Sequence, residues 1–445
     1  MQSIRHKLRP IQFIALGYML TILIGTLFLI LPISSKDGKM TNFLDAMFIA
    51  TSATCVTGLS VFDTFAHWTF FGQLIILFLI QIGGLGLMTV ITLIFLILRK
   101  NIGIYERTIL IQSAGTFSFH GIVHLIKRIL IGTFTFELIG ALVLSFRFIP
   151  QFGLGQGIWF SVFHSISAFC NAGFDLLGNS LIDYKNDPLV IITITSLVII
   201  GGLGFLVWSE IFDARKHFKF KNLSLHTKIV LVYNTLLLLT SAVLFFIFEY
   251  NHTLKDLSLG QKILDSWFMA VTPRTAGFCI FEQSSYSESG SLLTIILMFI
   301  GGNPGSTAGG VKTTTILVVL VNIIASAKRK EEVTLFRKKI SNNILKQSSA
   351  LVLMYLCVSV LSTLFICAIE PFSMTQIFFE VISAEATVGL SYGITSSITW
   401  GSKLIIIFLM FAGRCGALTL FSAFLRKGRY DKAILKCPEG NILVG

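Results

Sequence analysis

Eight apolar segments, each long enough to cross a bilayer, constrain this chain more than any other feature. They fall near 11–33, 70–98, 122–148, 188–212, 226–250, 290–326, 347–369 and 402–425. A helix needs about 20 apolar residues to span a hydrocarbon core of about 30 Å. Only 13% of the residues are charged, too few to cover a soluble protein. We therefore expect an all-α integral membrane protein with eight transmembrane helices.

The basic residues predict the orientation of these helices. An even number of spans puts both termini on one side, and the loops expected there hold 25 Lys and Arg residues against eight in the opposite loops. Cytoplasmic loops carry such an excess. We expect a multi-pass protein of the cell membrane, embedded in the lipid bilayer, with both termini cytoplasmic. The net charge of +13 then reflects the excess of basic residues in the cytoplasmic loops, so we expect no nucleic-acid partner.

A fourfold internal repeat occupies the loops on the other side. Each loop contains an apolar stretch too short to span the bilayer. Each stretch ends in a small polar cluster, FIATSATCVTGLS, SISAFCNAGFD, FMAVTPRTAGF or VISAEATVGLS. The clusters align on Gly58, Gly173, Gly277 and Gly389, and a second set of glycines (IGGLG twice, then IGGNPG and FAGRCG) follows in phase. Each unit is predicted as a helix, a re-entrant half-helix, a polar loop and a second helix.

The repeat also predicts how the units assemble. We expect them at 1–110, 111–220, 221–340 and 341–445, with pore loops at about 42–60, 157–175, 261–280 and 374–391. Two spans per unit give all four one orientation, so they can surround an axis along the membrane normal. Irregular backbone at membrane depth is tolerated around a water-filled cavity, where rings of carbonyl oxygens can replace the hydration shell of a cation. We expect four pseudo-symmetric helix–pore-loop–helix units around one central pore.

A polar stretch, GGNPGSTAGGVKTTT, interrupts the third unit at 301–315. Its glycines and proline make a continuous helix improbable. The pattern is close to a phosphate-binding loop, but Val311 separates Gly310 from Lys312, so a membrane-bound NTPase is only a remote alternative. We expect this loop to be a flexible gate below the glycine clusters, level with an intramembrane arginine. The predicted gate residues are Gly301, Gly302, Asn303, Pro304, Gly305, Ser306, Thr307, Ala308, Gly309, Gly310, Lys312 and Arg414.

One glycine of this type in each of four linked, non-identical units resembles the Trk/Ktr/HKT superfamily of potassium transporters. Thr387–Gly389 also resembles the start of the potassium-channel filter TVGYG, although no second glycine follows in any unit. The interrupted third unit and Arg414 resemble the KtrB-type membrane subunits of that superfamily, and the resemblance covers essentially the whole chain. The filter residues that it implies are Val56, Thr57, Gly58, Leu59, Asn171, Ala172, Gly173, Phe174, Thr275, Ala276, Gly277, Phe278, Thr387, Val388, Gly389 and Leu390.

The resemblance further implies potassium uptake by a homodimer that works with a cytosolic ring of nucleotide-binding regulatory subunits (KtrA-type). Potassium is then the substrate and sodium a candidate activator, with no resident cofactor. No histidine, cysteine or carboxylate pattern predicts a catalytic or metal site, so we expect no enzyme. An ion-coupled secondary transporter stays open as the alternative. Asp45, Asp265 and Glu380 are interpreted as helix caps or as charges of the outer mouth, and Glu385 has no acidic counterpart in the other units.

Overall fold

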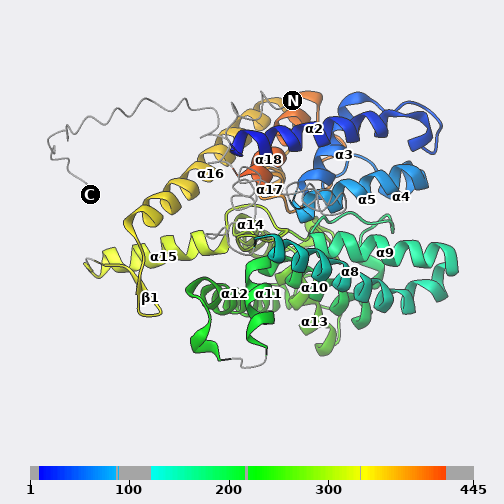
Figure 1. Ribbon diagram of the computed structural model, residues 1–445. Coiled ribbons are helices and arrows are strands. Elements are labelled where there is room, and N and C mark those ends of the chain that lie inside the picture. Colours follow the sequence, from blue (N-terminus) through cyan, green and yellow to red (C-terminus); the bar gives the residue numbers. More distant parts are fainter. Residues whose placement is uncertain (1–9, 87–88, 90–121, 216–218, 331, 417–445) are drawn as a thin grey trace.

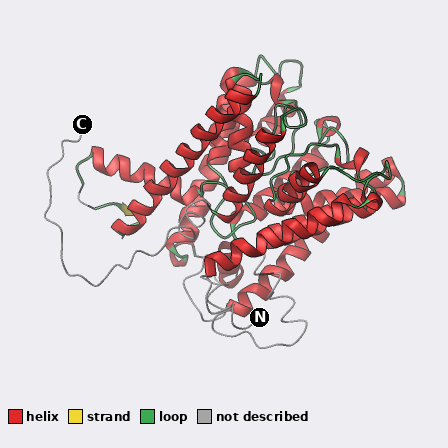
Figure 2. Ribbon diagram, turned by 90° about the horizontal axis from the view of Figure 1, so that it is seen from above, coloured by secondary structure: helices red, strands yellow, loops and turns green. Residues whose placement is uncertain are grey.

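The computed structural model describes residues 10–86, 89, 122–215, 219–330 and 332–416. The described part is almost entirely helical (Figure 2). The far ends of the predicted spans 70–98 and 402–425 and the basic residues within 1–9, 90–121 and 417–445 lie outside it. The boundary predicted at 110/111 also falls there, and the unit boundaries stay predictions.

The first helix of each unit is long and continuous. These helices are α2 (Pro10–Ile30), α8 (Ile122–Phe152), α12 (Leu225–Glu249) and α16 (Asn342–Ile369). They are the four helices in the described residues that are long and apolar enough to cross a membrane without a break. Their outward side chains are apolar and exposed, for example Leu20, Phe146 and Leu361. Such surface is stable against lipid and not against water, as expected for a multi-pass membrane protein.

The re-entrant half-helices occur where the repeat predicts them. They are α3 (Phe43–Cys55), α9 (Leu154–Cys170), α13 (Leu259–Val271) and α17 (Met374–Glu385), too short to span a bilayer. Ser258 and Ser373 begin α13 and α17 as capping boxes, each paired with a glutamine three residues on. All four helices are largely buried near their C-terminal ends. Their C-terminal ends therefore lie deep inside the protein.

The second helix is broken in units 2 and 3, and in units 1 and 4 its described part ends at a glycine. The break in unit 2 differs from the continuous span predicted there. The helix α5 (Phe70–Leu85) ends at Gly86, and α18 (Trp400–Cys415) ends at Gly416. In unit 2, α10 (Pro188–Leu203) and α11 (Phe205–Ala214) meet at Gly204 with a bend of 93°. In unit 3, α14 (Glu288–Phe299) and α15 (Thr313–Ala327) flank the predicted loop. Gly86, Gly204 and Gly416 have positive φ, a conformation that glycine adopts at little cost.

The units close into a ring. Each second helix packs against the half-helix of the following unit: α5 against α9, α10 against α13, α14 against α17, and α18 against α3. The repeated glycines pack within a unit, because a β-carbon on Gly83, Gly201 or Gly413 would lie 2.0–2.2 Å from the backbone oxygen of Thr54, Phe169 or Glu385 in the half-helix of the same unit. These glycines therefore let the second helix approach its own half-helix closely.

The remaining elements are short and lie in the connections within and between the units. The short helix α4 (Thr64–His67) and the 3₁₀ turns η1 (Pro32–Ser34), η2 (Ile182–Tyr184) and η4 (Gln283–Ser285) lie near the half-helices, and η3 (Phe220–Asn222) precedes α12. A hairpin of β1 (Thr334–Leu335) and β2 (Lys338–Lys339) joins α15 to α16 and lies at the far left of Figure 1, opposite α4.

Candidate ion pore

The four predicted filter glycines form a closed ring of backbone contacts. A β-carbon on Gly58 would lie 2.5 Å from the Ala172 oxygen, and one on Gly173 would lie 2.9 Å from the α-carbon of Gly277. One on Gly277 would lie 2.5 Å from the Val388 oxygen. One on Gly389 would lie 2.1 Å from the Thr57 oxygen. Each glycine therefore contacts the next unit, and unit 4 returns to unit 1.

The backbone at this ring follows one conformation in all four units. Every glycine has positive φ, between 69° and 95°. The residue two positions earlier (Val56, Asn171, Thr275 or Thr387) also has positive φ, between 52° and 67°. Left-handed backbone at a non-glycine residue costs about 1–3 kcal/mol and persists only where the surroundings impose it. This left-handed backbone recurs in four loops of different sequence. The site therefore requires the backbone shape, and the identity of the side chain matters less.

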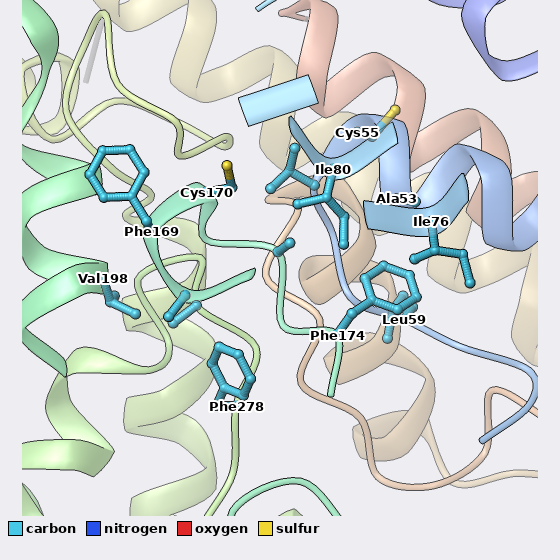
Figure 3. Packing of buried hydrophobic residues seen from close by; sticks show 14 of the residues in the cluster. Ala53, Cys55, Leu59, Ile76, Ile80, Phe169, Cys170, Phe174, Val198 and Phe278 are labelled. Atoms are coloured by element: carbon cyan, nitrogen blue, oxygen red, sulfur yellow. The ribbon is translucent and has the colours of Figure 1, made fainter. Parts of the chain in front are cut away.

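Hydroxyl groups at the ends of the half-helices hold this backbone. Ser52 and Ser383 accept the N–H of Gly58 and Gly389, each at 3.1 Å. Ser167 donates to the Phe174 oxygen at 2.7 Å, and Thr272 donates to the Phe278 oxygen. The residues that follow the glycines then enter buried apolar surroundings, and Leu59, Phe174 and Phe278 belong to one cluster (Figure 3). The loops are thus fixed from both sides.

A cavity of about 510 Å³ lies on one side of the ring, here called the mouth, and is lined by all four glycines. Asp63, Asp175 and Glu282 also line it. The Asp175 carboxylate accepts the N–H groups of Leu177 and Gly178 at 2.9 and 3.0 Å. Burial nevertheless raises the pKa of Asp175 to about 6, and the nearby Asp63 adds to the rise. The mouth therefore carries negative charge at neutral pH, and this charge attracts cations.

The loop of the third unit lies on the opposite side of the ring and contacts the other units. Asn303 donates from its side chain to the Gly202 oxygen at 2.8 Å, and Thr307 donates to the Phe169 oxygen at 3.3 Å. A β-carbon on Gly309 would lie 2.0 Å from Oγ1 of Thr387. The loop residues Asn303, Thr307 and Ala308 are buried. The loop is therefore buried between units 2 and 4 and contacts Thr387 of the unit 4 pore loop.

Two arginines bind the backbone around this loop. Arg414 donates to the oxygens of Thr307 and Gly83, so it joins unit 4 to the loop and to unit 1. Arg414 is thus in direct contact with the loop. Arg274 is buried and donates to Asn234 and, at 3.3 Å, to the Gly301 oxygen. Arg274 is one of the eight basic residues counted in the outer loops, but it lies buried inside the protein.

Lys312 does not form a phosphate-binding loop here. Its ammonium group donates to the oxygens of Ala308 and Gly309 at 2.7 and 3.5 Å. The Gly305 oxygen accepts the N–H of Phe205 at 2.7 Å. In these hydrogen bonds the backbone oxygens of the loop accept from Lys312 and Phe205. A phosphate-binding loop would instead direct its N–H groups to a ligand.

The acidic residues of the half-helices mostly make protein contacts. Asp45 forms a 2.7 Å ion pair with Lys403, joining units 1 and 4. Glu380 accepts hydrogen bonds from Ser391 and Thr395, and Glu385 accepts one from Ser359. Asp265 is fully buried, and its carboxylate has no hydrogen-bond partner among the described residues. For Asp45 and Glu380 the structural interpretation is therefore the better one.

Sequence reasoning missed three parts of this site. The positive φ at Val56 and its counterparts has no residue signature, because valine, asparagine and threonine all occupy that position. Among the acids of the mouth, Asp63 and Glu282 each follow their glycine by five residues and Asp175 follows by two, and this partial regularity was overlooked. Arg274 could have been found, because it lies three residues before Gly277 and thus close to the membrane centre.

Comparison with known proteins agrees with this architecture. The family model described as "TrkH: Cation transport protein" matches residues 12–432. The chain is 40% identical to the potassium/sodium uptake protein NtpJ of Enterococcus hirae, over 100% of this chain and 99% of that protein. It is 41% identical to the Ktr system potassium uptake protein B of Bacillus subtilis, over 99% and 97%.

A solved structure shares the fold. The crystal structure of the potassium transporter TrkH from Vibrio parahaemolyticus superposes with a TM-score of 0.76 at 19% identity, over 94% of this chain and 86% of that one. The family consists of transporters, which agrees with the expectation that the chain is not an enzyme. From the full-length family match, the identity of the relatives and the shared fold, we conclude that this chain belongs to the TrkH family of cation transport proteins.

Proposed function

We propose that the protein takes up potassium through a selectivity filter made of residues 56–59, 171–174, 275–278 and 387–390. The observation that carries the proposal is the closed ring of Gly58, Gly173, Gly277 and Gly389, with the same left-handed backbone in every unit. Such a backbone can direct carbonyl oxygens toward a common axis, where they replace the water around a monovalent cation. The half-helices end at the ring, and the partial negative charge of their C-termini favours a cation.

The loop at 301–312 and Arg414 are proposed as the gate. The loop lies beneath the ring, where it blocks the path of an ion that leaves the filter. Arg414 adds a positive charge on that path and holds the loop through the Thr307 oxygen. The polar contacts between this loop and the other units are mostly single hydrogen bonds to backbone oxygens. Each such bond contributes about 1 kcal/mol, so small movements of α14 and α15 can exchange them.

We also propose control by a cytosolic nucleotide-binding ring of the KtrA type, and the connectivity supports it. The gate loop continues into α15, and α15 leads into the basic hairpin around Lys338 and Lys339. With both termini cytoplasmic, this hairpin faces the cytosol and offers a regulatory subunit a lever on the gate. Two of the similar proteins are named as parts of a Ktr system. We further propose a homodimer with one pore in each chain, and sodium as an activator.

The test is ion flux into proteoliposomes that contain the purified chain. We expect thallium or rubidium entry that potassium competes with more strongly than sodium, and that does not need a sodium gradient. Entry that stops without such a gradient would favour the ion-coupled secondary transporter. Equal competition by potassium and sodium would contradict the filter assignment.

A further inference from the structure

A groove of about 440 Å³ lies between α8 and α11, away from the pore axis. We call it the α8–α11 groove. Its inner wall is apolar and includes Ile129, Phe136, Phe205 and Trp208. Gly132 widens it, because a β-carbon there would meet only Trp208 of the residues packed around it, at 3.4 Å. An apolar groove of this shape on a membrane protein fits a hydrocarbon chain.

The rim of the groove carries two arginines and one acid. Arg128 donates from Nη1 to Asp213 at 2.7 Å and to Ser209 at 3.2 Å, which fixes its guanidinium group. Nε and Nη2 of Arg128 have no partner among the described residues. Arg215 also lines the groove, is exposed and has no ion-pair partner in the described part. The rim therefore has a net positive charge and free N–H donors.

We propose that the α8–α11 groove binds an anionic phospholipid, with an acyl chain against Trp208 and Phe136 and the phosphate at Arg128 and Arg215. Charge complementarity selects this occupant, since arginine N–H groups match phosphate oxygens in charge and geometry. The depth of the groove in the membrane also agrees with a lipid as the occupant. The groove lies on the half of α8 that begins at Ile122, which faces the cytoplasmic leaflet in the proposed topology. Basic pockets between helices on that side bind anionic headgroups.

The groove also touches the proposed gate, and this step rests on the proposed function. Phe205 lines the groove with its side chain, and its N–H donates to the Gly305 oxygen of the gate loop at 2.7 Å. Gly204 is the bend between α10 and α11, and a β-carbon on it would lie 2.7 Å from the Pro304 oxygen. An occupant that holds α11 therefore holds the loop. The lipid acts as a stabiliser of the closed loop.

Binding is tested first, without reference to flux. The chain is reconstituted in nanodiscs of phosphatidylcholine with 20% phosphatidylglycerol (about one lipid in five), and retained phosphatidylglycerol is counted by native mass spectrometry after detergent release. We expect the double variant Arg128→Gln, Arg215→Gln to retain it roughly tenfold less well. Gly132→Leu should do the same by filling the groove without changing charge. Lys127→Gln, which removes a neighbouring charge outside the groove, is the matched control.

Two results would overturn the site. Retention by both groove variants at the level of Lys127→Gln would show that the lipid binds elsewhere. A cysteine at Ile131 that crosslinks to a second copy of the chain would show that protein, not lipid, covers the groove.

The coupling is tested by flux at rising fractions of phosphatidylglycerol. Phe205 is the first residue of α11, where proline is tolerated. Phe205→Pro removes the N–H that Gly305 accepts, and Phe205→Ala removes the side chain but keeps that N–H. We expect phosphatidylglycerol to slow flux through the wild type and Phe205→Ala, and not through Phe205→Pro. Equal slowing in all three would refute the coupling. Deleting Asn303–Ala308 tests the gate separately, because a deletion that stays closed refutes the gate and leaves lipid binding intact.

Discussion

Replacing Gly389 by alanine tests the filter more sharply than any other single change. Gly389 has φ of +94°, and a β-carbon there would lie 2.1 Å from the Thr57 oxygen. An ordinary contact begins at 3.4 Å, so the two groups must separate by about 1.3 Å. The Thr57 carbonyl belongs to the neighbouring unit of the ring, and a shift of this size removes it from its place in the proposed filter.

The expected effect is a loss of potassium affinity. A hydrogen-bond-like contact to a charged group contributes about 1.5–3 kcal/mol. At about 1.4 kcal/mol for each factor of ten, the half-saturating potassium concentration should rise roughly ten- to hundredfold. Sodium should be excluded less well, because fewer oxygens keep fixed positions. Thallium flux into proteoliposomes with potassium and sodium as competitors measures both quantities.

Gly393 provides the matched control. Its φ is +83°, and no atom lies within 4 Å of a β-carbon placed on it. Gly393→Ala therefore carries the backbone strain of about 1–3 kcal/mol without the collision. It should lower thermal stability to a similar extent and leave ion competition unchanged. The reasoning would be refuted if Gly389→Ala bound potassium as tightly as the wild type. It would also be refuted if Gly393→Ala raised the half-saturating potassium concentration by the same factor as Gly389→Ala.

Three further outcomes are expected. Arg414→Ala loses the bond to the Thr307 oxygen and a charge beneath the ring, so basal flux should increase severalfold; a variant that assembles and transports like the wild type would remove Arg414 from the gate. Deleting Asn303–Ala308 should give faster flux that no longer depends on a regulatory subunit, as shown by comparing proteoliposomes with and without added cytosolic fraction. Asp175 ionises with a pKa of about 6, so lowering the external pH from 7 to 5 should raise the half-saturating potassium concentration by protonating it. In Asp175→Asn, which keeps an oxygen for the N–H groups of Leu177 and Gly178, this pH effect should shrink at constant maximal flux.

Much of the fold followed from periodic features of the sequence. The long apolar runs predicted α2, α8, α12 and α16, and the recurring glycines predicted the half-helices and their common orientation. The interruption at 301–315 also lies where its composition predicts. These features are local in the chain, so a single sequence contains them.

The break in the second helix of unit 2 was not predicted. The IGGLG motif there allows close packing, and Gly201 does pack against the Phe169 oxygen, but Gly204 also turns the chain by 93°. Apolar residues continue on both sides of Gly204, so the hydropathy of the sequence does not predict the bend. The difference arises from tertiary contacts, since Phe205 uses its free N–H to bind the Gly305 oxygen of another unit.

The proposed position of the 301–312 loop on the pore axis has a consequence for how such a protein can be assembled. Space on an axis can be filled once. Four identical subunits would each bring a copy of the 301–312 segment to the same place, and the copies would collide. A single chain with four unequal units avoids this, because it can place a glycine-rich crossing in one quadrant and a supporting arginine in another, here Arg414. Gene fusion of the units therefore permits a single, central plug that rotational symmetry would forbid.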